Sequence, residues 1–314
     1  MNIVFLDART VGTEPNLARF EDFGSLTLYA DTQSDQTLER ISEAAVVITN
    51  KVKITGDMMR QCPSLKLICV AATGTNNIDL ETAKQLGIAV KNVKGYSTDS
   101  VAQVTVSHLL TLLHSPAYYD AYVKTGEYSK ETIFTHYGKP FVELRGKRVG
   151  ILGLGEIGRQ TAYILAAFGA EIVYFSASGQ SQNVPYQRVE LDELLTTSDV
   201  LSIHAPLTPQ TAGIIGYAQL QQMKPTALLL NTSRGGIVKE ADLARALDDD
   251  LIAGAAIDVF EQEPVAANHP YLHLKKPEKL LITPHIAWAS VESRGRLVEA
   301  IYQNIKSFLE EYSF

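Results

Sequence analysis

The sequence predicts an α/β protein of two βαβ domains, each built around a parallel sheet. Its 314 residues exceed the usual size of one domain, and an apolar fraction of 46% is enough for two cores. Short apolar runs alternate with polar stretches of helical spacing in both halves of the chain. A glycine-rich segment also lies between a predicted strand and a predicted helix. We expect one domain from residues 1–100 together with 288–314, and the other from residues 101–287.

The first predicted domain opens with short apolar or β-branched runs that read as strands. A helix is indicated before the last of them, because Leu80, Ala83 and Leu86 recur at helical spacing and Gly87 closes the pattern. Residues 288–312 are helical in pattern, and we expect them to return to this domain. The strands are expected at residues 2–6, 45–49, 66–72 and 88–91.

A long helix is predicted between the two domains. Residues 98–114 carry a broad apolar stripe that stops before Pro116, and the segment is long enough to cross from one domain to the other. Residues 116–146 show no clear periodicity and are richer in Tyr, Gly and Lys. We expect this excursion to wrap around a second copy of the chain, which predicts a homodimer.

The second predicted domain has the strand count of a doubly wound dinucleotide-binding fold. Each of its first strands is followed by a helical pattern, and a strand ends the series. The strands are expected at residues 148–152, 171–175, 199–204, 226–231, 252–258 and 280–283, and the helices at 157–168, 191–195, 217–223 and 240–248.

Composition excludes several classes of partner. The chain has 28 Lys and Arg against 35 Asp and Glu, a net charge of −7, and should repel nucleic acid and anionic membrane surfaces. Cys62 and Cys69 are too few for a disulfide framework or a four-ligand zinc site, so we expect no metal. No basic segment opens a signal peptide, and no apolar run approaches the roughly 18 residues of a membrane span. These features predict a cytoplasmic protein.

The glycine-rich segment predicts a cofactor loop. Gly153, Gly155 and Gly158 follow a strand and open a helix in the spacing G-x-G-x-x-G. Gly153 permits the tight turn, Gly155 lets the backbone approach a pyrophosphate, and Gly158 allows close packing of helix and strand. The helix N-terminus adds unpaired N–H groups for the phosphates. The segment therefore predicts a Rossmann domain that binds a nicotinamide dinucleotide.

The residue expected to choose between NAD and NADP is neutral. An acidic residue about twenty positions after the glycines usually accepts the ribose hydroxyls of NAD, but Ser176 stands there. A hydroxyl neither repels a 2′-phosphate nor binds the diol as strongly as a carboxylate. No arginine follows until Arg188, so the cation typical of NADP selectivity is absent from the adjacent loop. We expect NAD as the cofactor, with NADP use plausible.

An arginine, a glutamate and a histidine follow three consecutive strands of the second domain. They are Arg234, Glu263 and His285. Because ligands bind at the carboxyl ends of the strands in an open α/β sheet, these side chains can converge on one site.

These strand-end segments resemble the D-isomer-specific 2-hydroxyacid dehydrogenases, and within that family the glycerate dehydrogenases, also called hydroxypyruvate reductases, most closely. The similarity covers nearly the whole chain, including residues 72–79 and 94–101. It implies a flavodoxin-like substrate domain, built from both chain ends, beside the Rossmann domain. It also implies an NAD(P)-dependent enzyme that interconverts a small D-2-hydroxy acid and its 2-keto acid, D-glycerate and hydroxypyruvate first, with glyoxylate as another substrate.

The resemblance implies roles for individual residues. Arg234, Glu263 and His285 would form the catalytic triad, and the N–H groups around Ala72, Thr73 and Gly74 would cradle the substrate carboxylate, with Tyr96 as a substrate-domain aromatic. The implied cofactor contacts are Gly153, Gly155, Glu156, Ile157, Gly158, Ser176, Ala205, Pro206, Thr211, Thr232, Ser233, Arg234 and Asp258.

The chemistry explains these residue types. Histidine is a common general acid in enzymes, and His285 would protonate the oxygen of the reduced carbonyl. Glu263, bonded to the other ring nitrogen, would orient the imidazolium and favour it. The planar fork of Arg234 suits a carboxylate and the neighbouring carbonyl oxygen at once.

Several alternatives stay open. Asp258 would reach the nicotinamide carboxamide or cap a turn, and Trp288 would line the substrate pocket or pack at the domain junction. A nicotinamide-sensing corepressor shares the implied fold and triad, although the chain has no low-complexity tail typical of an interaction hub. Phosphoglycerate dehydrogenase is the nearest rival enzyme, but no extra cationic cluster for a phosphate is evident, and formate dehydrogenase fits less well.

Overall fold

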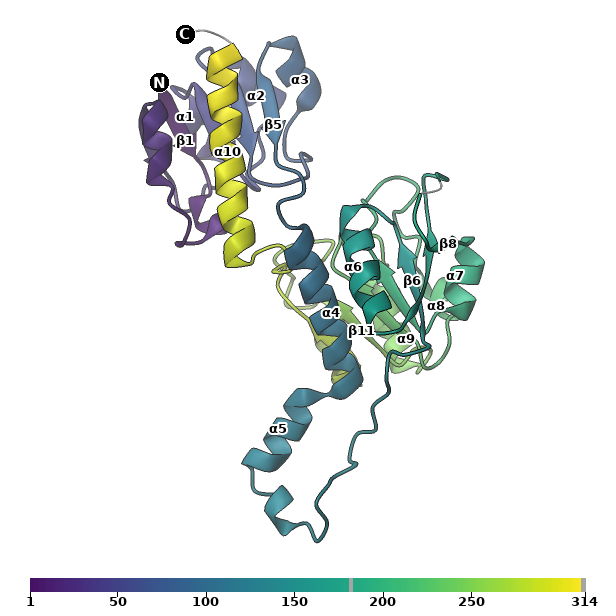
Figure 1. Ribbon diagram of the computed structural model, residues 1–314. Helices are drawn as coiled ribbons and strands as arrows, with labels where there is room; N and C mark the ends of the chain where they lie inside the picture. Colours follow the sequence, from purple (N-terminus) through teal and green to yellow (C-terminus); the bar gives the residue numbers. More distant parts are fainter. Residues whose placement is uncertain (181–182, 312–314) are drawn as a thin grey trace. The chain divides into compact units, whose positions relative to one another are not determined.

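The protein, seen in a computed structural model, is described over residues 1–180 and 183–311 and contains two parallel sheets (Figure 1). The chain divides into two units. The first comprises Met1–Ser97 and the segment from Trp288 onward, and the second comprises Thr98–Ala287. The break therefore lies after Ser97, where helix α4 (Thr98–His114) begins, and not after residue 100. Helix α4 packs on the second sheet. The last expected helical residue, 312, lies outside the described residues, as do residues 313 and 314.

The first unit has the strand order β2-β1-β3-β4-β5, which is the flavodoxin-like order. This confirms the predicted fold class. The edge strand β2 was not predicted, because three of its four residues are exposed and the strand forms no apolar run. The strands are β1 (Asn2–Phe5), β2 (Ser25–Leu28), β3 (Val46–Thr49), β4 (Leu67–Val70) and β5 (Ala89–Asn92). The helices are η1 (Ala8–Val11), η2 (Ala18–Phe23), α1 (Thr37–Ile41), α2 (Gly56–Arg60), α3 (Leu80–Gln85) and α10 (Val291–Glu311).

Helix α10 brings the end of the chain back onto this first sheet (Figure 1). Its residues Leu297, Ile301 and Ile305 are fully buried, and they share a core cluster with Phe5 and Ile48 of the strands. Full burial of one such side chain stabilises a fold by about 1.5–3 kcal/mol. Helices α1, α2 and α3 contribute to a separate cluster with the strand residues of opposite orientation, so helices cover both faces of the sheet.

The second unit has the strand order β12-β11-β10-β9-β6-β7-β8. The order reverses between β6 and β9, which is the switch point of a Rossmann fold. The two-residue strand β8 was not predicted. The strands are β6 (Arg148–Leu152), β7 (Glu171–Phe175), β8 (Gln187–Arg188), β9 (Val200–Ile203), β10 (Leu228–Asn231), β11 (Gly254–Ile257) and β12 (Leu280–Ile282). The helices after α4 and α5 (Pro116–Lys124) are α6 (Glu156–Ala167), α7 (Leu191–Thr197), α8 (Tyr217–Leu220) and α9 (Glu240–Asp248), with the short turns η4 (Pro270–His273) and η5 (Pro277–Lys279).

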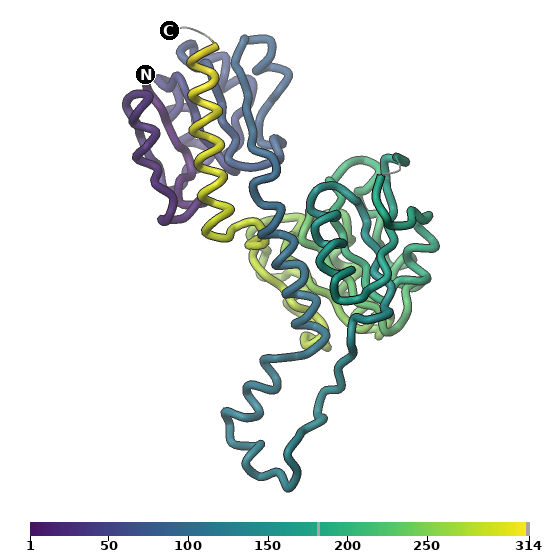
Figure 2. The backbone as a smooth tube through the Cα atoms, viewed as in Figure 1, coloured from purple at the N-terminus to yellow at the C-terminus, as the bar shows by residue number. Residues whose placement is uncertain are grey.

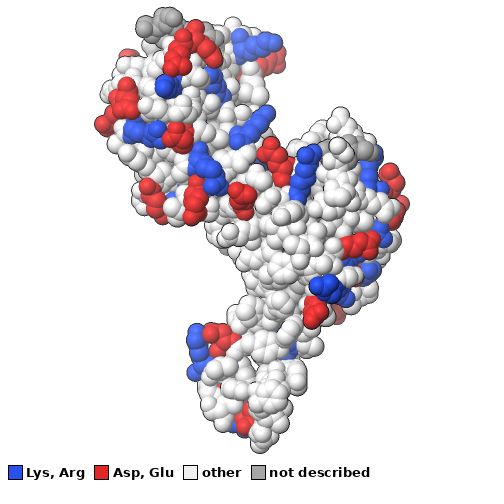
Figure 3. All heavy atoms as spheres, viewed as in Figure 1, with Lys and Arg blue, Asp and Glu red and all other residues white. Residues whose placement is uncertain are grey.

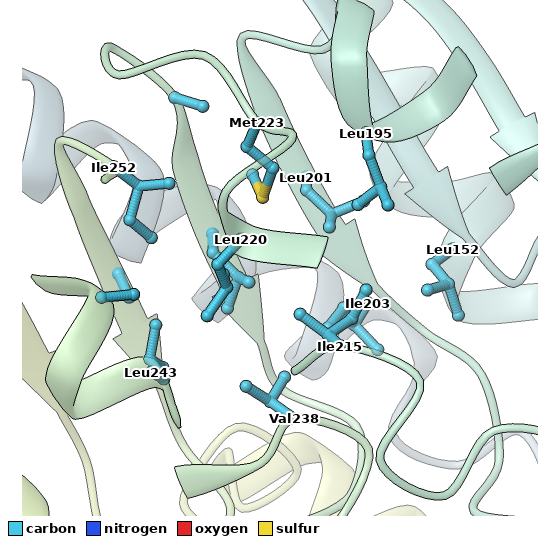
Figure 4. Packing of buried hydrophobic residues seen from close by; sticks show 14 of the residues in the cluster. Leu152, Leu195, Leu201, Ile203, Ile215, Leu220, Met223, Val238, Leu243 and Ile252 are labelled. Carbon is cyan, nitrogen blue, oxygen red and sulfur yellow. The ribbon is translucent and has the colours of Figure 1, made fainter. Parts of the chain in front are cut away.

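Two apolar clusters lie on the two faces of the second sheet. Figure 4 shows one of them, in which Leu220 of α8 and Leu243 of α9 pack against strand residues such as Leu201 and Ile203. On the other face α4 and α6 meet the sheet through residues such as Leu109. Because the strands are buried on both faces, they form near-continuous apolar runs, and for this reason the sequence located them well.

Residues 116–143, which we call the arm, leave α4 and return to β6 as an extension of the second unit (Figure 2). The arm contains helix α5 (Pro116–Lys124) and the turn η3 (Tyr128–Lys130), where the sequence predicted no regular structure. Helix α5 buries no residue, so it lacks the apolar stripe from which a helix is predicted. Large apolar side chains are exposed along the arm, above all Phe134 and Tyr137.

Acidic and basic side chains are interspersed on the face drawn in Figure 3. None of the described helices is long and apolar enough to span a membrane. Within residues 1–180 and 183–311, no group of three or more His, Cys, Asp or Glu side chains is arranged to hold a metal ion.

Candidate active site

The predicted triad residues lie after three neighbouring strands of the second sheet. Arg234 follows β10, Glu263 follows β11 and His285 follows β12. Because parallel neighbours end at the same edge of a sheet, these side chains leave it on one side.

Glu263 and His285 form the closest contact of the site. His285 Nδ1 lies 2.7 Å from Glu263 Oε2, although the residues are 22 positions apart. The other carboxylate oxygen accepts the N–H of Phe260 at 3.0 Å. The His285 side chain is 24% exposed, and the Glu263 side chain 30%. Since Nδ1 faces the carboxylate, Nε2 is the nitrogen that remains for a ligand, which is the orientation that the proposed acid requires.

The backbone of His285 has a left-handed conformation, with φ 55°. Such a conformation costs a residue other than glycine on the order of 1–3 kcal/mol and persists only where the surroundings enforce it. Here the N–H of His285 is bonded to the carbonyl of Thr283 at 3.0 Å. The histidine is therefore held in a tight turn directly after β12.

Asp258 anchors the segment Thr283–Ala287, which we call the His285 loop. Its fully buried carboxylate accepts the Thr283 hydroxyl at 2.6 Å and the N–H groups of Ile286 and Ala287 at 2.9 and 2.8 Å. Two roles were expected for Asp258, and the hydrogen bonds in the structure correspond to the capping of a turn. Oδ2 accepts the N–H of Ala287, and a carboxylate oxygen can accept two hydrogen bonds, so a carboxamide contact is compatible with this role.

Helix α4 supplies a second support that sequence reasoning missed. Ser100 Oγ donates to the carbonyl of Ala287 at 2.6 Å, and Thr105 Oγ1 lies 2.7 Å from the hydroxyl of Thr232. His108 Nε2 lies 3.4 Å from the Thr283 hydroxyl, and burial lowers the pKa of this imidazole. Polar residues recurring along one side of an apolar helix were the signal in the sequence.

Arg234 projects from a turn that its neighbours fix. Asn231 Nδ2 donates to the carbonyl of Arg234 at 2.9 Å, and Asn231 Oδ1 accepts the N–H of Ser233 at 3.1 Å. A Cβ atom on Gly235 would lie 2.0 Å from the carbonyl of Phe260, so only glycine fits there. Its NH1 donates to the carbonyl of Ser233 at 2.7 Å, and among the described residues Arg234 makes no ion pair, which leaves its other guanidinium N–H groups for an anionic ligand.

The glycine loop has the shape that a dinucleotide requires. Gly153 has φ 93°, and a Cβ there would lie 2.7 Å from the backbone of Ala205. A Cβ on Gly158 would lie 2.3 Å from the carbonyl of Gly153. At Gly155 no atom lies within 4 Å of a Cβ, so the loop leaves open space where α6 begins with Glu156. These residues therefore fit a pyrophosphate group, and NAD would be held here by the first N–H groups of α6.

The neighbouring loop after β9 is fixed by one of its own hydroxyls and by one from the segment after β10. Thr211 Oγ1 donates to the carbonyl of Pro206 at 2.6 Å, and Ser233 Oγ donates to the carbonyl of Ala205. Just before it, burial lowers the pKa of His204 to about 4, so this histidine is neutral at physiological pH. Of the implied cofactor residues, Ala205, Pro206, Thr211, Thr232 and Ser233 thus lie on segments beside the switch point.

Ser176 is the first residue after β7 and begins the segment Ser176–Gly179, which we call the ribose loop. Ser176 Oγ lies 3.1 Å from Ser178 Oγ. Arg188, remote in sequence, lies on β8 beside Tyr174, and its NH1 donates to the carbonyl of Gly179 at 2.6 Å. The structure thus places the guanidinium of Arg188 beside this loop, whereas its distance along the chain had suggested that no cation lies there.

In the first unit, the implied substrate residues follow β4 and β5. Thr73 Oγ1 donates to the carbonyl of Val93 at 3.0 Å, which ties the two loops together. Within the described part of the chain, the N–H groups of Thr73 and Gly74 donate to no acceptor, as a carboxylate cradle would require. Tyr96 packs edge-on against Trp288 with ring centroids 6.2 Å apart, and Trp288 contacts the core of this unit.

Asp7 is a further buried carboxylate that the sequence did not single out. It follows β1 and accepts the N–H groups of Asn50, Lys51 and Val52 in the loop after β3. Burial raises the pKa of Asp7, although these hydrogen bonds oppose the shift. This carboxylate fixes a loop at the carboxyl edge of the first sheet.

Comparison with known proteins identifies the family. Residues 106–287 match the family model for the D-isomer specific 2-hydroxyacid dehydrogenase, NAD binding domain. The chain is 37% identical over 283 residues to a hydroxypyruvate reductase of Blautia hydrogenotrophica, covering 89% of this chain and 86% of the relative. It is 35% identical over 311 residues to a glycerate dehydrogenase of Methylorubrum extorquens, covering 98% and 96%. The structure of D-lactate dehydrogenase from Aquifex aeolicus, complexed with NAD and lactic acid, matches with a TM-score of 0.84 at 28% identity, covering 99% of this chain and 96% of that one. The chain belongs to the D-isomer-specific 2-hydroxyacid dehydrogenase family and is an NAD(P)-dependent oxidoreductase.

Proposed function

We propose that the chain interconverts hydroxypyruvate and D-glycerate, with glyoxylate as a second keto acid. The observation that carries the proposal is the 2.7 Å contact between His285 and Glu263. This contact lies beside the turn that carries Arg234, which makes no ion pair among the described residues. The choice of hydroxypyruvate is supported by the two relatives whose names specify it or its reduced form, and both matches cover most of the chain.

His285 is the proposed proton donor. NADH, when bound, supplies the hydride that reduces the C2 carbonyl. The carbonyl oxygen then carries a developing negative charge, and His285 Nε2 donates a proton to it. Glu263 faces Nδ1 and so compensates the positive charge of the imidazolium before transfer. In the oxidation of D-glycerate the same nitrogen accepts the proton of the hydroxyl.

Arg234 and the loop after β4 are the proposed holders of the keto acid. The guanidinium offers parallel N–H donors, which suit the substrate carboxylate and its adjacent carbonyl oxygen. Contact with that oxygen strengthens as charge develops on it, so Arg234 also stabilises the transition state. The N–H groups of Thr73 and Gly74 are proposed as further donors to the carboxylate.

We also propose a homodimer in which the arm binds a second copy of the chain. Its exposed apolar residues Val123, Ile133, Phe134, Tyr137 and Phe141 have no core of their own to enter. The arm nevertheless has a defined shape, because Tyr118 and Tyr122 both hold one histidine: the Tyr118 hydroxyl lies 2.9 Å from His136 Nε2, and the Tyr122 ring stacks on it. A preformed apolar surface favours association with a partner of matching shape.

Sedimentation equilibrium tests the dimer. Phe134→Ser combined with Tyr137→Ser should convert the dimer to monomer, whereas Tyr163→Ser, at an exposed tyrosine of α6, should leave the mass unchanged. A dimer that survives both substitutions at full affinity would exclude the arm as the interface.

Initial rates test the reaction. We expect hydroxypyruvate to give the highest kcat/KM among hydroxypyruvate, glyoxylate, pyruvate and 3-phosphohydroxypyruvate, each measured with NADH and with NADPH. His285→Ala run in parallel shows whether the turnover belongs to this site. A preference for pyruvate or for the phosphorylated acid would reject the proposed substrate while leaving the family assignment intact.

A further inference from the structure

We propose that Glu240 and His269 form a positioning pair that fixes the position of the backbone segment Phe260–Glu263. By fixing this segment, the pair keeps Glu263 in contact with His285 and also keeps the Arg234 turn in place. The proposal rests on the proposed roles of Glu263 and His285. Neither Glu240 nor His269 belongs to the predicted site, and both are nearly buried, with 13% and 8% of their side chains exposed.

Both carboxylate oxygens of Glu240 form hydrogen bonds, one with the backbone of this segment and one with His269. It is the first residue of α9. Its Oε1 accepts the N–H of Glu261 at 2.8 Å, and its Oε2 lies 2.8 Å from His269 Nε2. The carboxylate thus bonds directly to the backbone two residues before Glu263.

His269 is fixed in one tautomer by its other nitrogen. Nδ1 accepts the N–H of Tyr271 at 3.3 Å, so Nε2 carries the proton and donates it to Glu240. Its ring is flanked by Phe260, with centroids 5.7 Å apart, and by Tyr271, at 4.8 Å. Packing and hydrogen bonds therefore agree on a single orientation of the ring.

The segment that the pair holds touches two members of the proposed triad. The N–H of Phe260 donates to Glu263 Oε1 at 3.0 Å, which aims the opposite oxygen at His285. The backbone of Phe260 and Glu261 also lies against Gly235, directly after Arg234. A shift of this segment would alter the His285 contact and the Arg234 turn together. A displacement of about 1 Å at a catalytic group can lower a rate by roughly 10²-fold.

Glu240→Gln breaks the pair while keeping its volume. The glutamine oxygen can still accept the N–H of Glu261, but its NH₂ group then faces the Nε2–H of His269. If the histidine moves its proton to Nδ1, that proton faces the N–H of Tyr271 instead. Either tautomer leaves two donors opposed, so the segment must shift.

The test is the pH profile of kcat/KM for hydroxypyruvate reduction, measured for Glu240→Gln, His269→Gln, Glu263→Gln and the double variant Glu240→Gln/Glu263→Gln. Reduction needs the protonated histidine, so activity falls on the basic side, and loss of the Glu263 contact moves this limb to lower pH. We expect Glu240→Gln and His269→Gln to move it in the same direction, and to lower kcat/KM by about 10-fold. The double variant should show no further movement than Glu263→Gln alone, because both changes act through one contact.

Two control variants separate positioning from stability. Glu278→Gln and His273→Gln change exposed residues of the same types, and both should retain the wild-type profile. Melting temperatures are recorded for every variant.

If Glu263→Gln moves the basic limb of the pH profile while Glu240→Gln and His269→Gln lower only the melting temperature, the positioning pair is rejected and the proposed function stands. If Glu263→Gln itself leaves the profile unchanged, the proposed role of Glu263 fails, and the positioning proposal fails with it. His269→Gln provides the same reading if Glu240→Gln does not fold.

Discussion

Two loops leave the carboxyl edge of the second sheet, and they are held very differently. The His285 loop after β12 is bonded three times to the buried carboxylate of Asp258 and once to Ser100 of α4. The ribose loop after β7 is supported by the contact between Ser176 and Ser178, by one internal backbone bond and by the side chain of Arg188. The first loop is rooted in the core, whereas the second lies at the surface.

This contrast shows that the buried carboxylate is placed at the loop that carries the candidate proton donor. Burying a carboxylate is costly unless hydrogen bonds compensate it, and Asp258 receives that compensation from three donors of the His285 loop. A proton donor must keep its geometry within a fraction of an ångström, whereas binding of a remote ribose tolerates adjustment. We therefore expect changes at the His285 loop to affect kcat, and changes at the ribose loop to affect KM.

The largest effect is expected at His285. His285→Ala removes the proton donor and should lower kcat by on the order of 10² or more. Affinity for NADH, measured by fluorescence titration, should change little because the backbone turn remains. A variant that retains wild-type kcat would exclude His285 as the proton donor. It would also contradict the expectation that changes at the His285 loop affect kcat.

A somewhat smaller effect is expected at Asp258. Asp258→Asn replaces one acceptor oxygen with an NH₂ group, which then opposes a donor of the His285 loop. An unsatisfied buried donor costs about 1–3 kcal/mol, so chemical denaturation should show a loss of that size, accompanied by a lower kcat. Asp35→Asn, at an exposed aspartate, serves as the control for the change of charge. Wild-type kcat in a destabilised Asp258→Asn would show that the anchor is unnecessary for the proton donor.

At the ribose loop, Ser176→Asp should act on cofactor choice. A carboxylate accepts hydrogen bonds from both ribose hydroxyls of NADH, a gain of about 1 kcal/mol, and repels the 2′-phosphate of NADPH. The ratio of kcat/KM for NADH over NADPH should rise, mostly through KM. An unchanged ratio would mean that Ser176 does not face the ribose.

The smallest effect is expected at Arg188. Its guanidinium reaches the ribose loop from β8, so Arg188→Gln should weaken NADPH binding, because it removes a positive charge that attracts the 2′-phosphate, and leave NADH almost unaffected. The expected loss is about a few fold, because solvent still partly screens this half-buried charge. The comparison of KM values for the two cofactors at low and high salt measures this. Equal losses for both cofactors would indicate that Arg188 only supports the loop.

The strands, the helix Thr98–His114 and the glycine loop were predictable because their signals are local. Buried parallel strands are apolar throughout, and the glycines are required by turns within their own segment. Strands β2 and β8 and helix α5 lack such a signal, since they lie at sheet edges or bury no side chain. The candidate triad was predictable because strand ends in this fold share one edge.

By itself, the sequence determined the fold class and the dinucleotide loop, since each follows from periodicity or from a motif within a short stretch of chain. It also indicated the three candidate triad residues, because each follows a predicted strand. Only the tertiary structure decided which side chains meet. Glu263 and His285 are 22 positions apart, Asp258 and Ala287 are 29 apart, and Arg188 is nine from Gly179, yet each pair is in contact. The physical reason is that strand adjacency sets these contacts, and the pairing of strands depends on how whole helices and sheets bury their apolar surfaces.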